Sequence, residues 1–161
     1  MNLEHHNQKA KQRQTEHKKF LTQIKNKPPK DFDRKMGEIH DEVFEKIDCL
    51  SCANCCRTTG PLFTHKDIER LSSLFRMKPS QFIDQYLRID EDNDYVLQSV
   101  PCPFLGADNY CSVYEHRPKA CREYPHTDRK KFYQINHLTL KNTMICPAAY
   151  EVVEEMMKKF K

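Results

Sequence analysis

Eight cysteines are the residues of this chain whose type and spacing most clearly indicate chemistry, and the first four fall within residues 49–56. This run reads Cys-x-x-Cys-x-x-Cys-Cys. Thiolates are strong ligands for soft and borderline metals, and spacers of two residues let neighbouring sulfurs turn toward one ion. The sequence therefore predicts a metal centre, and its candidate ligands are Cys49, Cys52, Cys55, Cys56, Cys102, Cys111, Cys121 and Cys146.

Two other uses of these thiols have to be weighed. Disulfides need an oxidising compartment, and the N-terminal residues lack the apolar core of a secretory signal. A redox dithiol matches the Cys-x-x-Cys spacing, but that motif normally follows a strand and opens a helix. Here a helix is expected just before Cys49. We therefore expect reduced thiols in a cytoplasmic protein that binds a metal ion.

The spacing does not select the metal. Cys-x-x-Cys-x-x-Cys is also the start of a bacterial ferredoxin run, which continues with three residues and Cys-Pro. In this chain Cys56 follows Cys55 at once, and only the distant Cys102 and Cys146 are followed by proline. Zinc accepts the same thiolates in tetrahedral sites. Zinc and an iron–sulfur cluster both stay open, as does the choice between one site and two.

The charge of the chain is divided unevenly. Residues 1–30 hold eight Lys or Arg against two acidic residues, a balance of +6, although the whole chain carries only +4. We expect a solvated basic extension there and no binding to nucleic acid, since the remaining residues are almost neutral. No apolar run reaches the length of about 18 residues that suggests a membrane span. We therefore expect no membrane association, and no protein partner is specified.

Apolar periodicity predicts several helices. A helix over residues 1–27 is expected to dock only around Phe20–Ile24 and to end before Pro28-Pro29. Further helices are predicted over 31–48, 64–75, 79–87, 118–125 and 147–161, the second of these with a capping box at Thr64 and Asp67. A hairpin is predicted within 89–100, and a strand near 132–139.

These elements predict an α+β fold that is mostly helical: a small metal-stabilised cysteine-cluster domain with a minor β-hairpin. We expect residues 1–30 to be a basic N-terminal extension and residues 31–161 to be the cysteine-cluster domain. Apolar residues make up 38% of the chain and charged residues 31%, which favours a thin core. In such a domain metal binding adds to the free energy of folding.

Four motifs together carry a family resemblance. They are the cysteine run from Cys49 to Cys56, Pro-Cys-Pro-Phe-Leu, Cys-Ser-Val-Tyr-Glu-His-Arg-Pro-Lys-Ala-Cys-Arg-Glu-Tyr-Pro, and a late Cys-Pro. In these the chain resembles the YkgJ-type cysteine-cluster proteins over roughly residues 45–150, which are described as zinc- or iron-chelating domains. The resemblance implies metal chelation by all eight cysteines and a cytoplasmic setting. It supplies no settled reaction.

A few other side chains are candidates for supporting roles. His116 and His126 flank Cys121 and could bind or orient a ligand, while Arg117 and Arg122 could offset thiolate charge. No role is expected for the histidines of the N-terminal arm, His5, His6 and His17. The sequence thus predicts a metal-chelating protein of undetermined cellular role and leaves open whether it is an enzyme. The alternative is an iron–sulfur redox protein or an accessory partner of an oxidoreductase.

Overall fold

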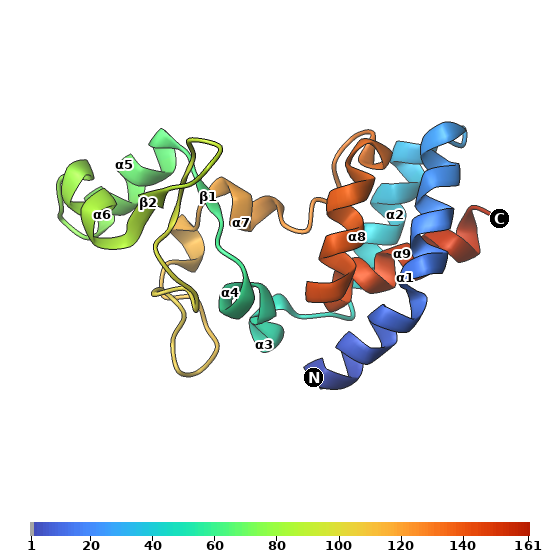
Figure 1. The fold of residues 1–161 in the computed structure, drawn as a ribbon, viewed down its shortest axis with the longest axis horizontal. Coiled ribbons are helices and arrows are strands. Elements are labelled where there is room, and N and C mark those ends of the chain that lie inside the picture. Colours follow the sequence, from blue (N-terminus) through green and yellow to red (C-terminus); the bar gives the residue numbers. More distant parts are fainter. Residues whose placement is uncertain (1) are drawn as a thin grey trace. The chain divides into compact units, whose positions relative to one another are not determined.

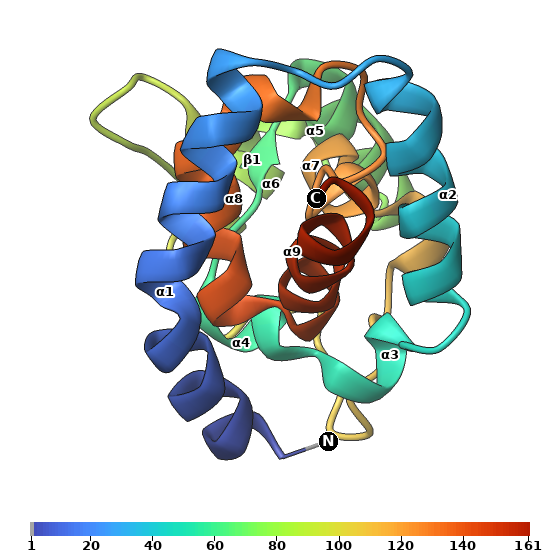
Figure 2. The ribbon, with the colours of Figure 1, turned by 90° about the vertical axis from the view of Figure 1, so that its right-hand side faces the viewer.

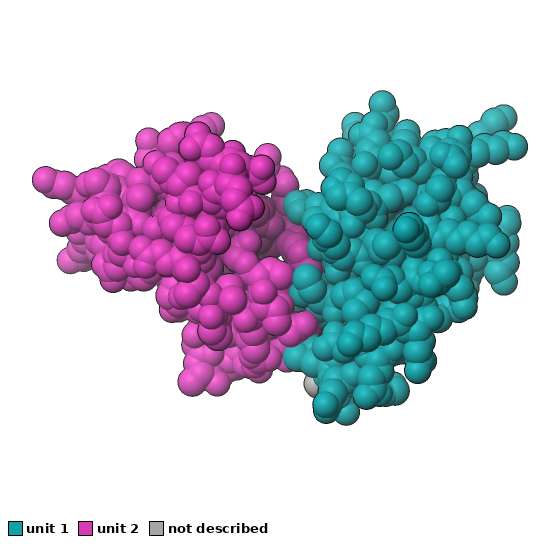
Figure 3. Space-filling view, viewed as in Figure 1, with its two compact units in different colours: residues 1–49, 125–161 teal, residues 50–124 magenta. Residues whose placement is uncertain are grey.

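The computed structural model describes residues 2–161 (Figure 1). Helices make up 62% of the structure, and a small part of the chain forms one antiparallel sheet of three strands. This confirms the mostly helical α+β fold class. The chain forms two compact units, coloured separately in Figure 3. Unit 1 comprises residues 1–49 and 125–161, and unit 2 comprises residues 50–124. None of the helices in residues 2–161 has the length and apolarity needed to cross a bilayer.

Unit 1 is a helical bundle. Its helices are α1 (Leu3–Asn26), α2 (Phe32–Phe44), α8 (Asn136–Ile145) and α9 (Pro147–Lys159), and the short 3-10 turn η2 (Phe132–Ile135) precedes α8. Helix α9 packs against the three others (Figure 2). The buried core holds Leu21, Ile24, Phe32, Met36, Ile39, Val43, Phe132, Ala148, Val152, Val153 and Met156.

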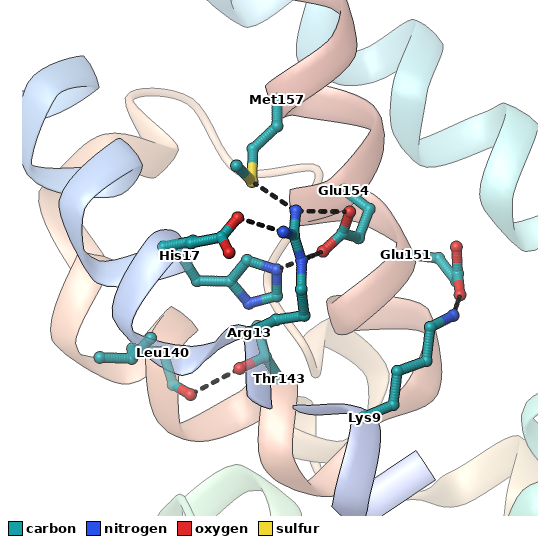
Figure 4. Close-up of polar contacts among 9 residues, drawn as sticks. Lys9, Arg13, His17, Leu140, Thr143, Glu151, Glu154 and Met157 are labelled. Carbon is teal, nitrogen blue, oxygen red and sulfur yellow. Dashed lines mark hydrogen bonds and ion pairs between the residues drawn. The ribbon is translucent and has the colours of Figure 1, made fainter. Parts of the chain in front are cut away.

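One face of α1 is buried beyond the part around Phe20–Ile24 where docking was expected, and Figure 4 shows the polar contacts of Arg13 and His17 on this face. His17 is fully buried, and its Nε2 lies 2.7 Å from Oε1 of Glu154 on α9. The same carboxylate accepts a hydrogen bond from Nε of Arg13 at 2.8 Å. The ring of Tyr150 on α9 contacts both His6 and His17. His6 and His17 are therefore structural residues, and the expectation that they have no role was wrong.

Unit 2 is built from short elements. They are α3 (Cys49–Cys52), whose first residue belongs to unit 1, α4 (Asn54–Thr58), β1 (Leu62–Phe63), α5 (His65–Leu74), α6 (Pro79–Tyr86), β2 (Leu87–Ile89), β3 (Tyr95–Leu97), the 3-10 turn η1 (Tyr114–His116) and α7 (Lys119–Glu123). The strands form an antiparallel sheet of order β1-β3-β2. Its separate core holds Phe63, Ile68, Leu71, Phe82, Leu87, Leu97, Phe104 and Val113.

Most predicted elements are confirmed, with one error. The capping box is present: Thr64 Oγ1 accepts from Asp67 N–H, and Asp67 Oδ2 accepts from Thr64 N–H. The hairpin is present as β2 and β3, to which β1 adds a third strand. The strand near 132–139 was wrong, because this segment forms η2 and the start of α8. Its buried side chains include Phe132 and Thr139, a spacing of seven residues that fits helical turns and not the alternation of a strand.

Candidate metal centre

The cysteine run forms two short helices. Cys49 and Cys52 are the first and last residues of α3, and Cys55 and Cys56 lie on α4. Between them Ala53 has a φ of 52°, a left-handed conformation that ends one helix and allows the next to begin. Cys49 belongs to unit 1 and the other three belong to unit 2. The run therefore consists of two short helical turns.

A main-chain hydrogen bond joins this run to the Pro-Cys-Pro motif within unit 2. The N–H of Cys102 donates to the carbonyl oxygen of Cys56, with 2.7 Å between nitrogen and oxygen. Cys111 is brought back toward the same motif, because it forms a β-bridge with Leu105. The side chains of Cys102 and Cys111 both pack against the core of unit 2. Three cysteines from separate motifs are thus placed by backbone contacts.

Cys121 is carried by the short helix α7, which packs against β1 (Figure 1). Helix α7 is fixed at its start by the carboxylate of Asp67, whose Oδ1 accepts from the N–H of Lys119 at 3.2 Å. The last cysteine, Cys146, lies in unit 1 as the N-cap of α9, where its Sγ accepts from the N–H of Ala149 at 3.4 Å. Cys121 and Cys111 are therefore both contributed to unit 2 by the third motif.

The charge of Cys56 affects the ionisation of three other thiols of unit 2, those of Cys102, Cys111 and Cys121. Burial, together with the charges of Cys56, Cys102 and Cys111, raises the pKa of Cys121 to about 12. Burial also raises the pKa of Cys102 to about 11, with added repulsion from Cys56 and Cys111. The pKa of Cys111 is raised by the same causes, burial first and then Cys56. These thiols are held protonated by burial and by mutual repulsion.

Cys56 differs from the other three. A hydrogen bond from the thiol of Cys55 lowers the pKa of Cys56 to about 7, against burial, and the guanidinium of Arg57 adds to the lowering. Arg57 is itself held within unit 2 by hydrogen bonds to the carbonyl oxygen of Cys52 and to Asn109. Cys56 is therefore the thiol of this group that most readily becomes a thiolate.

The chemistry of these donors fits zinc or iron. Within residues 2–161 no three His, Cys, Asp or Glu side chains already have the spacing of a closed ion site. The charges of Cys56, Cys102 and Cys111 nevertheless help to raise the pKa of Cys121, and that of Cys56 helps to raise the pKa of Cys102 and Cys111, as expected of thiols in one region of unit 2. Their side chains would therefore have to turn toward an ion to bind it. The positive charge of such an ion stabilises thiolates, and it offsets the repulsion between thiolates that otherwise keeps these thiols protonated.

Three residues predicted to support the metal centre, His116, His126 and Arg117, differ in where the structure places them. His116 is exposed in η1, and its carbonyl oxygen accepts hydrogen bonds from Arg70. His126 belongs to unit 1. Arg117 lies over the ring of Tyr114, 3.8 Å from its centroid, and its charge lowers the pKa of Cys111 and Cys121 against the larger effect of burial.

Sequence reasoning missed two residues near this group, Arg57 and Arg70. An arginine next to a cysteine pair was the available signal for Arg57. Arg70 had none, because it contacts residues 116 and 117, far away in the sequence. Asp67 was recognised only as part of a helix cap. Its contact with Lys119 depends on the tertiary fold.

A family model matches most of the chain. Residues 48–146, which contain all eight cysteines, match the model of the CxxCxxCC family, described as "Putative zinc- or iron-chelating domain". Neither the curated proteins nor the solved structures gave a match. The match covers more than half of the chain and agrees with the resemblance in the cysteine motifs, so the chain belongs to the CxxCxxCC family of zinc- or iron-chelating domains.

Proposed function

We propose that this protein binds zinc or iron through the thiolates of Cys56, Cys102, Cys111 and Cys121. The observation that carries the proposal is the convergence of three sequence motifs in unit 2. It is supported by the 2.7 Å hydrogen bond between Cys102 and Cys56 and by the effect of the charges of Cys56, Cys102 and Cys111 on the pKa of Cys121. Four thiolates are a common ligand set for structural zinc and for iron–sulfur centres.

The bound metal would supply positive charge that makes the thiolate form of all four cysteines favourable. The chain's own residues contribute in two ways. Cys56, with its pKa of about 7, offers the first thiolate at neutral pH. Arg57 and Arg117 then offset part of the negative charge that four thiolates retain around a divalent ion. Metal binding would release the protons of the other three thiols.

The proposed role is chelation that contributes to the fold of unit 2, without an assigned reaction. The core of unit 2 is small, and its cysteine-bearing segments are short helices and turns. Holding these segments through one ion adds metal-binding free energy to folding. For Cys49, Cys52, Cys55 and Cys146 metal ligation stays a prediction from the sequence, as do a cytoplasmic location and the division at residue 30.

The test uses the full chain and Co²⁺, which reports thiolate ligation through a ligand-to-metal charge-transfer band. We expect the band to appear on titration and to be lost from Cys56→Ser, Cys102→Ser, Cys111→Ser and Cys121→Ser variants. Elemental analysis and the absorption spectrum of the isolated protein separate zinc, which is colourless, from iron. The proposal fails if Co²⁺ binds without a charge-transfer band, or if the four variants bind it as wild type does.

A further inference from the structure

We propose that Asp67 and Arg70 of α5 are positioning residues for the metal centre, because they fix residues 116–119 and thereby the placement of the Cys121 thiol. This inference rests on the proposed function, since it takes Cys121 as a ligand. Neither residue is part of the cysteine motifs. Both reach the segment before Cys121 from a helix that lies some fifty positions earlier in the sequence.

Arg70 holds the backbone of this segment directly. Its Nε lies 3.2 Å from the carbonyl oxygen of His116, and its Nη2 lies 3.0 Å from the carbonyl oxygen of Arg117. The same Nη2 lies 2.8 Å from Oδ1 of Asp67, an acceptor on its own helix. The planar guanidinium can donate hydrogen bonds to two neighbouring carbonyl oxygens at once, and the single ammonium of a lysine cannot do so in the same geometry.

Asp67 makes more contacts than a helix cap requires. Its Oδ2 completes the capping box with the N–H and hydroxyl of Thr64, at 2.9 and 2.8 Å. Its Oδ1 is directed elsewhere, to Arg70 and to the N–H of Lys119. The side chain is only 2% exposed, so these hydrogen bonds form away from water, where leaving one unmade is costly. Oδ2 thus caps the helix, while Oδ1 binds Arg70 and the N–H of Lys119. We call the hydrogen bonds from Asp67 and Arg70 to residues 116–119 the clamp.

The clamped segment has little structure of its own. It consists of one 3-10 turn and the start of α7, which has only five residues. A helix this short is not stable by itself in water, so the contacts at its first turn decide where it lies. Lys119 is two residues before Cys121. Loss of the clamp therefore leaves the Cys121 thiol without a fixed position relative to the other three.

The test compares two variants of the full chain, each of which removes one set of contacts made by α5 and its N-cap. Arg70→Ala removes the hydrogen bonds of Arg70 to residues 116 and 117 and keeps the capping box, whereas Thr64→Ala removes the cap and keeps those hydrogen bonds. Co²⁺ affinity is measured by competition with a chelator, the charge-transfer spectrum is recorded, and thermal unfolding of the metal-free protein serves as the stability reference. We expect Arg70→Ala to weaken Co²⁺ binding by about tenfold or more, as is usual for residues that orient a ligand, and to alter the spectrum.

Thr64→Ala should lower the unfolding temperature but keep the wild-type affinity and spectrum. Arg70→Lys keeps the charge without the fork and should rescue binding only in part, and it carries the test if Arg70→Ala does not fold. Wild-type affinity in Arg70→Ala, full rescue by lysine, or equal losses in the Arg70 and Thr64 variants would each overturn the inference. If the wild-type chain shows no Co²⁺ charge-transfer band, the proposed function fails first and takes this inference with it.

Discussion

The main-chain nitrogen of Cys102 lies 2.7 Å from the carbonyl oxygen of Cys56 and donates a hydrogen bond to it. This bond joins the cysteine run at the start of unit 2 to the Pro-Cys-Pro motif that follows the sheet. Because it uses backbone atoms, it places both cysteines without occupying either thiol. The two thiols have very different pKa values: the hydrogen bond from Cys55 lowers that of Cys56 to about 7, whereas burial above all raises that of Cys102 to about 11.

The first prediction concerns Cys102. Replacing it with serine should reduce the metal retained per chain and lower the thermal stability of the metal-loaded protein by well over the 0.5 kcal/mol or so typical of surface changes. Elemental analysis after gel filtration and calorimetry provide the measurements. Ile89→Ser is the matched control, since Ile89 is 56% exposed in the same unit. Equal metal contents in the two variants would contradict the assignment of Cys102.

A second prediction follows from the unequal pKa values. The lowered pKa of Cys56 favours its thiolate near pH 7 in the metal-free protein, while the raised pKa values of Cys102 and Cys121 favour their thiol forms. Iodoacetamide should therefore alkylate Cys56 well before the other two, as mass spectrometry of peptides can follow. Zinc should protect all of them. Alkylation of Cys121 at the rate of Cys56 would show that burial and repulsion do not hold its proton.

The third prediction concerns the acid stability of unit 1. Burial raises the pKa of Glu154, but hydrogen bonds from Arg13 and His17 outweigh it and lower the value to about 2 from the ordinary 4.5. Folding therefore favours the carboxylate, a contribution that is complete above pH 4.5 and is lost as the pH falls toward 2. Glu154→Gln should destabilise the protein at pH 7 by about 2 kcal/mol, allowing for solvent screening at a carboxylate that is 18% exposed.

Glu155→Gln is the control for this change, because Glu155 pairs with Lys158 on the surface of the same helix. It should alter the free energy of unfolding by no more than about 0.5 kcal/mol. Denaturant titrations at pH 7 and pH 3 check both variants. The difference between Glu154→Gln and wild type should shrink at pH 3, and a difference that stays constant with pH would contradict the role given to this carboxylate.

The fourth prediction is that metal removal affects the two units unequally. Unit 1 has long helices around a core of eleven buried side chains. The four proposed ligands, Cys56, Cys102, Cys111 and Cys121, all belong to unit 2. Unit 2 has eight buried core side chains and contains the proposed ligands. Chelation should therefore expose sites within residues 50–124 to limited proteolysis while most of the helical circular dichroism remains. Cleavage that begins in α1 or α9 would contradict this order.

The periodic segments were predictable from sequence because their signals are local. Thr64 with Asp67, Pro79 and the apolar spacing of residues 147–161 each fix an element by contacts within a turn or two. The burial of His17 was not predictable, since it depends on Glu154 from the other end of the chain. The hydrogen bonds from Arg70 to the carbonyl oxygens of residues 116 and 117 were not predictable for the same reason. Local patterns carry no information on which distant carboxylate or carbonyl will face a side chain.

The most direct test of metal binding by the thiols of unit 2 is native mass spectrometry of the full chain beside a variant with Cys56, Cys102, Cys111 and Cys121 all replaced by serine. The wild-type chain should retain zinc or iron. Its measured mass should equal that of the chain plus the metal, less one proton for each thiol that ionises on binding. The variant should lose that metal while circular dichroism reports the helices of unit 1. A variant that retains the wild-type amount of metal would contradict the account, because its ligands would then lie outside these four cysteines.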